Sequence, residues 1–197
     1  MRGAAGLSLL LVLLWAGAAL ALGPSYDCSG VEPGGVEALV CGDEGLSALD
    51  RELAGVYGAA LLRAAGERPS TLKPEQRGWL HERDACICTP DPRQCTADSY
   101  RRRMAALTAR YDLAPPVGQA RFTCADQPGA VVLARFYATE PGVLVIERGG
   151  RRLLMFQERS ASGARYAAQG REFWEHQGEA LAIWTPGAPQ VRCVQAP

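Results

Sequence analysis

This chain of 197 residues has few histidines and a formal net charge of zero. It has only two histidines, His81 and His176, and its 21 basic side chains are balanced by 21 acidic ones. It also lacks the Gly-x-Ser-x-Gly elbow, the phosphate loop and the dinucleotide fingerprint that mark large enzyme classes. We therefore interpret the chain as a non-enzyme without a cofactor. The lack of a strongly basic patch argues against binding to nucleic acid.

A second long apolar run is absent as well. The only one lies in residues 1–21, where Arg2 precedes an apolar stretch at 7–14 and Ala19-Leu20-Ala21 resembles a cleavage site. The stretch is shorter than the ~20 residues that a transmembrane helix needs. A lipoprotein anchor would need a cysteine directly after the small residues, but the first cysteine is Cys28. We expect a signal peptide at 1–21, no stable membrane anchor after its cleavage, and a location in the periplasm or outside the cell.

The chain changes character at 113–119, where Ala-Pro-Pro-Val-Gly at 114–118 interrupts any regular element. Before this linker, apolar residues recur at helical spacing and predict helices over 46–65, 74–86 and 97–111. Asp43 or Ser47 is the candidate cap of the first helix, and Thr96 that of the third. Residues 22–113 hold 11 basic and 14 acidic side chains, against 9 and 7 in residues 114–197. We predict a helical domain over 22–112.

After the linker, short β-rich segments alternate with turn residues. They predict eight strands, over 120–124, 130–137, 143–147, 152–157, 164–168, 172–176, 180–185 and 191–194. Gly149-Gly150 is typical of a hairpin turn between two of them. The predicted fold is α+β in two domains, a small disulfide-stapled helical domain followed by a compact eight-stranded antiparallel β-barrel over 120–197.

Seven cysteines follow residue 21, and an oxidising compartment favours disulfides among them. Cys124 lies in the first predicted strand and Cys193 in the last. Those strands are neighbours in a closed barrel, which makes a bridge plausible. In the helical half, an antiparallel hairpin would bring Cys41 to Cys86. Cys28 would then pair with Cys95 and leave Cys88 over. The swapped pairs, Cys28–Cys86 and Cys41–Cys95, are equally possible. A third alternative is a zinc site of His81, Cys86, Cys88 and Cys95, although their spacing matches no common zinc signature. We expect no metal.

The helical half carries a combination of short motifs. These are Cys28, Cys-Gly-Asp-Glu-Gly-Leu at 41–46, Leu-Asp-Arg-Glu-Leu at 49–53, Gln-Arg-Gly-Trp-Leu at 76–80, Arg-Asp-Ala-Cys at 83–86, Cys95 and the segment 100–107. Together they resemble the LprI-type N-terminal domain of bacterial envelope proteins. The resemblance implies the fold and assigns no site. From the residues themselves we expect Trp79 in the core and Asp50, Arg83 and Asp84 in an ion-pair set between helices.

The strand half carries a second set of motifs. These are Phe-Thr-Cys at 122–124, the apolar run at 131–136, Ser-Gly-Ala-Arg-Tyr at 162–166, Phe-Trp at 173–174, Glu-Ala at 179–180 and Cys193. Over residues 120–194 they look like the family of membrane-bound c-type lysozyme inhibitors. In such inhibitors a Ser-Gly-x-x-Tyr loop and a Lys-Gly loop enter the catalytic cleft of the enzyme. The resemblance implies that Ser162, Gly163 and Tyr166 bind lysozyme, with Arg165 as an additional cation.

The second loop departs from the family pattern. An ungapped match places His176 where lysine is usual and Gln177 where glycine is usual; aligning Gly178 with the usual glycine instead puts Gln177 at the lysine position. The lysine is absent either way. A protonated histidine next to a carboxylate can substitute for it. We expect Trp174, just before this loop, in the core.

The sequence thus predicts a periplasmic inhibitor of c-type lysozyme, which occludes the catalytic cleft with the loop at 162–166. The alternative is a non-inhibitory envelope module that binds a periplasmic partner or a cell-wall component through its helical domain. The missing lysine favours the alternative, and the intact Ser-Gly-x-x-Tyr motif favours inhibition.

Overall fold

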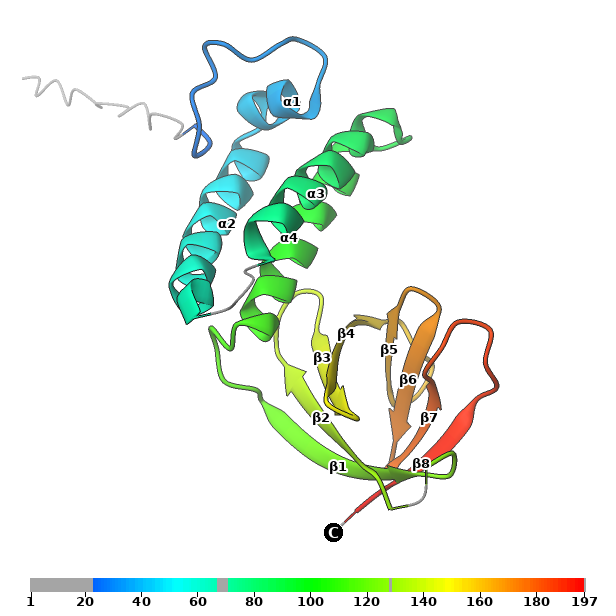
Figure 1. The fold of residues 1–197 in the computed structure, drawn as a ribbon. Coiled ribbons are helices and arrows are strands. Elements are labelled where there is room, and N and C mark those ends of the chain that lie inside the picture. The colour runs from blue at the N-terminus through cyan, green and yellow to red at the C-terminus, as the bar shows by residue number, and fades with distance from the viewer. Residues whose placement is uncertain (1–22, 67–70, 128, 197) are drawn as a thin grey trace, which may run out of the picture.

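A helical region and a β-barrel follow one another along the chain (Figure 1). The computed structural model describes residues 23–66, 71–127 and 129–196. The signal peptide expected at 1–21 lies outside these residues. Within them, the two predicted secondary-structure classes occur in the predicted order, and the fold class is confirmed.

The helical region contains one more helix than the sequence pattern predicts. Its elements are α1 (Val36–Gly42), α2 (Glu44–Arg63), η1 (Ala64–Gly66), α3 (Leu72–Asp84), η2 (Ala85–Cys88) and α4 (Pro92–Arg110). Helix α1 is too short to show a helical period. Asp43 caps α2 by accepting a hydrogen bond from the Leu46 backbone N–H, as predicted. The cap of α4 is Asp91 and not Thr96, because a proline in the first turn starts the helix earlier.

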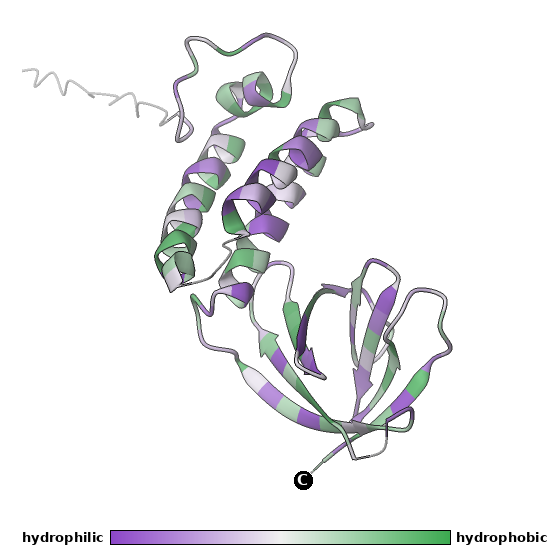
Figure 2. Cartoon of the chain, in the orientation of Figure 1, coloured by the Kyte–Doolittle hydropathy of each residue, from purple (hydrophilic) through white to green (hydrophobic). Residues whose placement is uncertain are grey.

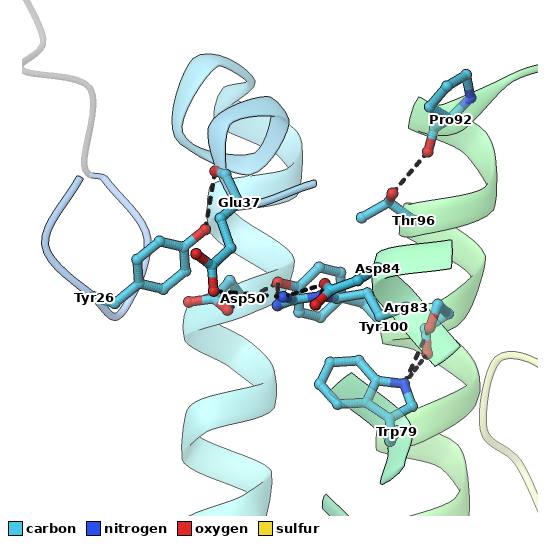
Figure 3. Close-up of polar contacts among 10 residues, drawn as sticks. Tyr26, Glu37, Asp50, Trp79, Arg83, Asp84, Pro92, Thr96 and Tyr100 are labelled. Atoms are coloured by element: carbon cyan, nitrogen blue, oxygen red, sulfur yellow. Dashed lines mark hydrogen bonds and ion pairs between the residues drawn. The ribbon is translucent and has the colours of Figure 1, made fainter. Parts of the chain in front are cut away.

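A polar network runs through the core of the helical region (Figure 3). The Tyr100 hydroxyl donates to Asp50 (2.9 Å) and accepts from Arg83 (3.2 Å), and Arg83 also holds Asp84 at 2.6 Å. The other Asp50 oxygen accepts two hydrogen bonds from Ser25. Burial raises the pKa of Tyr100 well above its ordinary value. The expected ion-pair set is therefore partly right, since Arg83 reaches Asp50 only through a tyrosine.

Trp79 completes this core, as predicted. Its side chain is 8% exposed, its ring packs edge-on against Tyr100 with centroids 5.4 Å apart, and its indole N–H donates to the Ser99 hydroxyl. The network and the edge-on ring pair tie α2, α3 and α4 to one another, which a helical region of this size needs because its apolar core is small.

The disulfides of the helical region are local, which overturns both predicted pairings. Cys28 is bonded to Cys41 and Cys86 to Cys95, with Cα separations of 6.0 and 5.5 Å. Helix α1 turns the chain so that Cys28 meets the cysteine at its own end, and η2 folds the corner between α3 and α4. Cys88 is left over as the unpaired thiol, as predicted, and it is exposed. The zinc alternative is wrong, because Cys86 and Cys95 are bonded to each other.

The second region is a closed barrel in which each strand pairs with its sequence neighbours and β8 returns to β1. Its strands are β1 (Gly118–Cys124), β2 (Val131–Tyr137), β3 (Val143–Arg148), β4 (Arg151–Glu158), β5 (Ala164–Ala168), β6 (Arg171–His176), β7 (Glu179–Ile183) and β8 (Val191–Gln195). Hydropathy alternates along the strands (Figure 2), because successive side chains point to opposite faces of a strand. Phe122 and Phe173 meet edge-to-face inside, at 5.3 Å.

Two predicted details of the barrel are confirmed. Cys124 and Cys193 are direct cross-strand partners and form a disulfide. Gly149 and Gly150 both have positive φ, 54° and 74°, and connect β3 to β4 as the two-residue hairpin that the sequence predicts.

The last helix packs directly on the outer wall of the barrel. Ala105 and Ala109 of α4 share an apolar cluster with Tyr137, Val143 and Val145 of β2 and β3. Alanine side chains allow this close approach of helix to sheet. The sequence pattern predicts a linker at this point and gives no indication that the two regions are packed together.

Candidate functional site

The two loops singled out by the sequence lie at one end of the barrel and touch each other. Alternate connections of an up-and-down barrel fall at the same end, so residues 159–163, between β4 and β5, lie beside residues 177–178, between β6 and β7. A Cβ atom built on Gly163 would lie 2.2 Å from the Glu175 carbonyl oxygen and 3.0 Å from the Cβ of His176. The backbone of the first loop therefore rests on the start of the second.

Gly163 is required at this contact for two reasons. Its φ of +64° is unfavourable for any residue with a Cβ, and the space that a Cβ would occupy is already filled by backbone. A glycine here lets the chain leave the exposed tip and enter β5 without pushing the two loops apart.

Hydrogen bonds hold the tip of the first loop. The Ser160 hydroxyl donates to the Ser162 carbonyl and accepts from the Ser162 backbone N–H at 3.3 Å. The Trp174 indole N–H donates to the same carbonyl at 2.8 Å. Ser162 is exposed, and within the described part of the chain its hydroxyl has no hydrogen-bond partner. The backbone of Ser162 is thus fixed while its hydroxyl remains available to a partner molecule.

The second loop is a tight two-residue turn. Gln177 and Gly178 both have positive φ, 52° and 81°, between the paired residues His176 and Glu179. Gly178 donates its N–H to the Glu175 carboxylate (3.3 Å) and accepts from the Gln195 backbone N–H (2.8 Å). The turn exposes the side chains of His176 and Gln177 next to the first loop.

Arg165 and Tyr166 leave the tip in opposite directions, because they are successive residues of β5. Tyr166 points into the barrel, is 6% exposed and packs its ring 5.8 Å from that of Phe136. Burial raises its pKa, and the nearby carboxylate of Glu175 adds to the shift. Arg165 points outward and forms an ion pair with Glu172 at 2.6 Å. The structure therefore gathers Ser162, Gly163, His176 and Gln177 at the tip and places Arg165 and Tyr166 behind it.

Trp174 is the site residue that sequence reasoning misplaced. It was expected in the core, but it is only half-buried and faces outward opposite Arg165, because its neighbour Phe173 fills the barrel interior. The alternation of side chains along β6 could have predicted this orientation, because Trp174 must point outward if Phe173 points inward. Its bond to the Ser162 carbonyl makes it part of the site.

No lysine lies at the tip, because the only lysine of the sequence, Lys73, belongs to α3. The positions that the tip offers to a partner are instead a serine hydroxyl, an imidazole and a carboxamide.

Two family descriptions match the two halves of the chain. Residues 28–107 match "Lysozyme inhibitor LprI", and residues 122–190 match "Membrane-bound lysozyme-inhibitor of c-type lysozyme". Over 160 residues the chain is 37% identical to "Lipoprotein LprI" of Mycobacterium bovis, an alignment that covers 80% of this chain and 78% of the relative. The chain belongs to the LprI family. The same identity and coverage hold for the proteins of that name in two strains of Mycobacterium tuberculosis.

Membership of the LprI family confirms both resemblances seen in the sequence. It supports a lysozyme-inhibitor role, hence a non-enzymatic protein, and a location outside the cytoplasm. No solved structure matches the chain. Among the helices at 23–66 and 71–110, none combines the length and apolarity that crossing a membrane requires.

Proposed function

We propose that this LprI-family chain inhibits a c-type lysozyme by inserting the loop tip around Ser162 into the catalytic cleft. The observation that carries the proposal is the state of Ser162, which is exposed, backbone-anchored and free at its hydroxyl. A glycosidase of this kind works with two carboxyl groups, one protonated and one ionised, facing the sugar. A serine hydroxyl can donate to the ionised one and accept from the protonated one.

The other predicted binding residues take different parts in this proposal. His176 and Gln177 lie beside Ser162 and extend the contact, with a protonated imidazole able to act as the cation that the missing lysine would supply. Gly163 keeps the tip narrow. Tyr166 acts from inside the barrel as a support, and Arg165 holds the β5–β6 surface through Glu172. We place the encounter in the periplasm or outside the cell.

Anchoring of the tip before binding favours inhibition. The Ser162 carbonyl is held by Trp174 and Ser160, and the loop backbone rests on the second turn. A loop that is already ordered loses little conformational entropy when it enters a cleft, so more of the contact energy remains as affinity.

The test is lysis of bacterial cell walls by a c-type lysozyme, titrated with the oxidised full chain and with Ser162→Ala. We expect stoichiometric inhibition by the unaltered chain and at least a tenfold weaker effect of the variant, about 1.4 kcal/mol. Ser160→Ala is less suitable, because Ser160 also holds the loop. Equal inhibition by Ser162→Ala and the unaltered chain contradicts the proposal.

The missing lysine favours one other function, a non-inhibitory envelope module that binds a periplasmic partner or a cell-wall component through the helical domain. It predicts that the unaltered chain leaves c-type, g-type and i-type lysozymes fully active. Co-purification of envelope components with the immobilised full chain would then identify the partner.

A further inference from the structure

The imidazole of His176 lies against the backbone of the first loop. A Cβ atom built on Gly163 would be 3.0 Å from the His176 Cβ and 3.1 Å from its Nδ1. His176 is nevertheless exposed, and within the described part of the chain its ring has no hydrogen-bond or ion-pair partner. The ring therefore sits beside the residue that follows Ser162 and is available to the same partner molecule.

The carboxylates next to His176 are already engaged. Glu179, its direct cross-strand partner on β7, forms an ion pair with Arg192 of β8. Glu175, the preceding residue of β6, accepts from the Gly178 backbone N–H at 3.3 Å. These contacts hold the turn between β6 and β7 and leave the imidazole to face the loop tip.

The charged groups on the other side of β6 come from β5, β4 and the first loop. Arg165 forms an ion pair with Glu172, and Glu158 is its cross-strand partner on β4. Arg159, at the start of the loop, is exposed. Arginine keeps its charge at every pH near neutrality, and carboxylates ordinarily titrate near pH 4.

Histidine, in contrast, is the side chain that ordinarily changes its charge between pH 5 and 8. The other histidine, His81, belongs to α3, as does the only lysine, Lys73. Among the described side chains at this end of the barrel, the His176 imidazole is therefore the one whose charge changes in that range. The loop tip gains one positive charge as the medium becomes mildly acidic.

We propose that protonation of His176 regulates this chain, so that it binds a c-type lysozyme more tightly in mildly acidic medium; this inference rests on the proposed function. The cleft that receives Ser162 contains an ionised carboxylate. An imidazolium beside that carboxylate donates a charge-assisted hydrogen bond, which is about twice as strong as the bond of a neutral imidazole. Binding therefore favours the protonated form, and affinity rises as the pH falls, until the carboxylate of the enzyme is itself protonated near pH 4.

The enzyme contributes a pH dependence of its own. The carboxyl group that acts as the acid in such glycosidases can have its pKa raised to roughly 6, and it loses its proton in the same range. Ser162 is proposed to accept from that group, so its ionisation also weakens binding at higher pH. The contribution of His176 is therefore measured as a difference between variants.

The experiment measures the dissociation constant of the complex between the oxidised full chain and a c-type lysozyme at about pH 5.5 and about pH 7.5, at constant ionic strength. The quantity compared is the ratio of the two constants. His176→Gln removes the titrating group, and His81→Gln is the matched control on the exposed surface of α3. We expect the ratio to be about fivefold larger for the unaltered chain and for His81→Gln than for His176→Gln. His176→Lys, which stays charged, should have the small ratio of His176→Gln but bind more tightly at both pH values.

The outcomes separate this proposal from the proposed function. If His176→Gln keeps the ratio of the unaltered chain while Ser162→Ala loses inhibition, the role of His176 is overturned and the loop mechanism stands. If the ratio falls in His176→Gln alone and Ser162→Ala inhibits fully, the role of His176 is supported and the Ser162 mechanism fails. If the unaltered chain does not bind at either pH, both fail. Thermal unfolding of each variant at both pH values verifies that the fold is intact.

Discussion

Replacement of Gly163 by alanine is the most direct test of the site geometry. The new Cβ would lie 2.2 Å from the Glu175 carbonyl oxygen and would also hold an L-residue at a φ of +64°. The left-handed conformation costs about 1–2 kcal/mol by itself. The close approach to backbone cannot be relieved by rotating a side chain, so the two loops must separate.

Gly187→Ala is the matched control. Gly187 has a φ of +77°, but nothing lies within 4 Å of the Cβ position, and it belongs to the β7–β8 connection at the other end of the barrel. It therefore carries the conformational cost without the clash. We expect it to lower the midpoint of thermal unfolding by a few degrees, at about 2–4 °C per kcal/mol for a chain of this length, and to inhibit fully.

The assay measures thermal unfolding and inhibition of a c-type lysozyme for both variants. Gly163→Ala should unfold at a lower temperature than Gly187→Ala and inhibit at least tenfold less well, because the Ser162 tip is displaced. If the two variants unfold at the same temperature and both inhibit like the unaltered chain, the contact between the two loops has no part in function and our reasoning about the site is wrong.

Three further substitutions test other contacts. Trp174→Phe keeps a ring but loses the hydrogen bond to the Ser162 carbonyl, worth about 0.5–1.5 kcal/mol, so we expect severalfold weaker inhibition with nearly unchanged chemical unfolding. Tyr100→Phe leaves one oxygen of the buried Asp50 carboxylate without its donor, while Ser25 still holds the other. It should lower the free energy of unfolding by about 1–3 kcal/mol, measured in urea, with inhibition unchanged in the protein that remains folded. Burial raises the pKa of Tyr137 from 10.0 to about 12, helped by its hydrogen bond to Asp112. The folded chain therefore holds this proton more tightly than the unfolded chain, and the stability due to it should be complete below pH 10 and lost as the pH rises toward 12. In Tyr137→Phe the alkaline loss of stability should be smaller, because only the contributions of Tyr26 and Tyr100, whose pKa values burial also raises, remain. An unchanged pH profile of unfolding would contradict the assignment.

Much of the barrel is determined by local patterns in the sequence. Alternation of polar and apolar residues sets each strand because successive side chains face opposite sides, and Gly149-Gly150 sets a turn because both positions need positive φ. The pairing of Cys124 with Cys193 also follows from the sequence, because closure of an eight-stranded barrel makes its first and last strands neighbours. The Ser-Gly-x-x-Tyr motif indicated the candidate loop because its residues lie close together in the sequence.

The pairing of the other cysteines could not be obtained in this way. A hairpin of two long helices brings Cys41 close to Cys86 in principle, but the short helix α1 and the turn η2 bring each cysteine to a nearer partner. Elements of one or two turns carry too few residues to show a period, so the pattern does not reveal them.

The sequence by itself determined the succession of a helical and a strand half, the eight strands, the barrel disulfide and the residues of the candidate loops. Only the tertiary structure decided which of those residues meet. Tyr166 points inward while Ser162 is exposed, Trp174 lies outside the barrel interior and bonds to the loop, and α4 packs on the barrel wall. These are contacts between residues far apart in the chain, and they depend on strand register and helix direction, which no local spacing encodes.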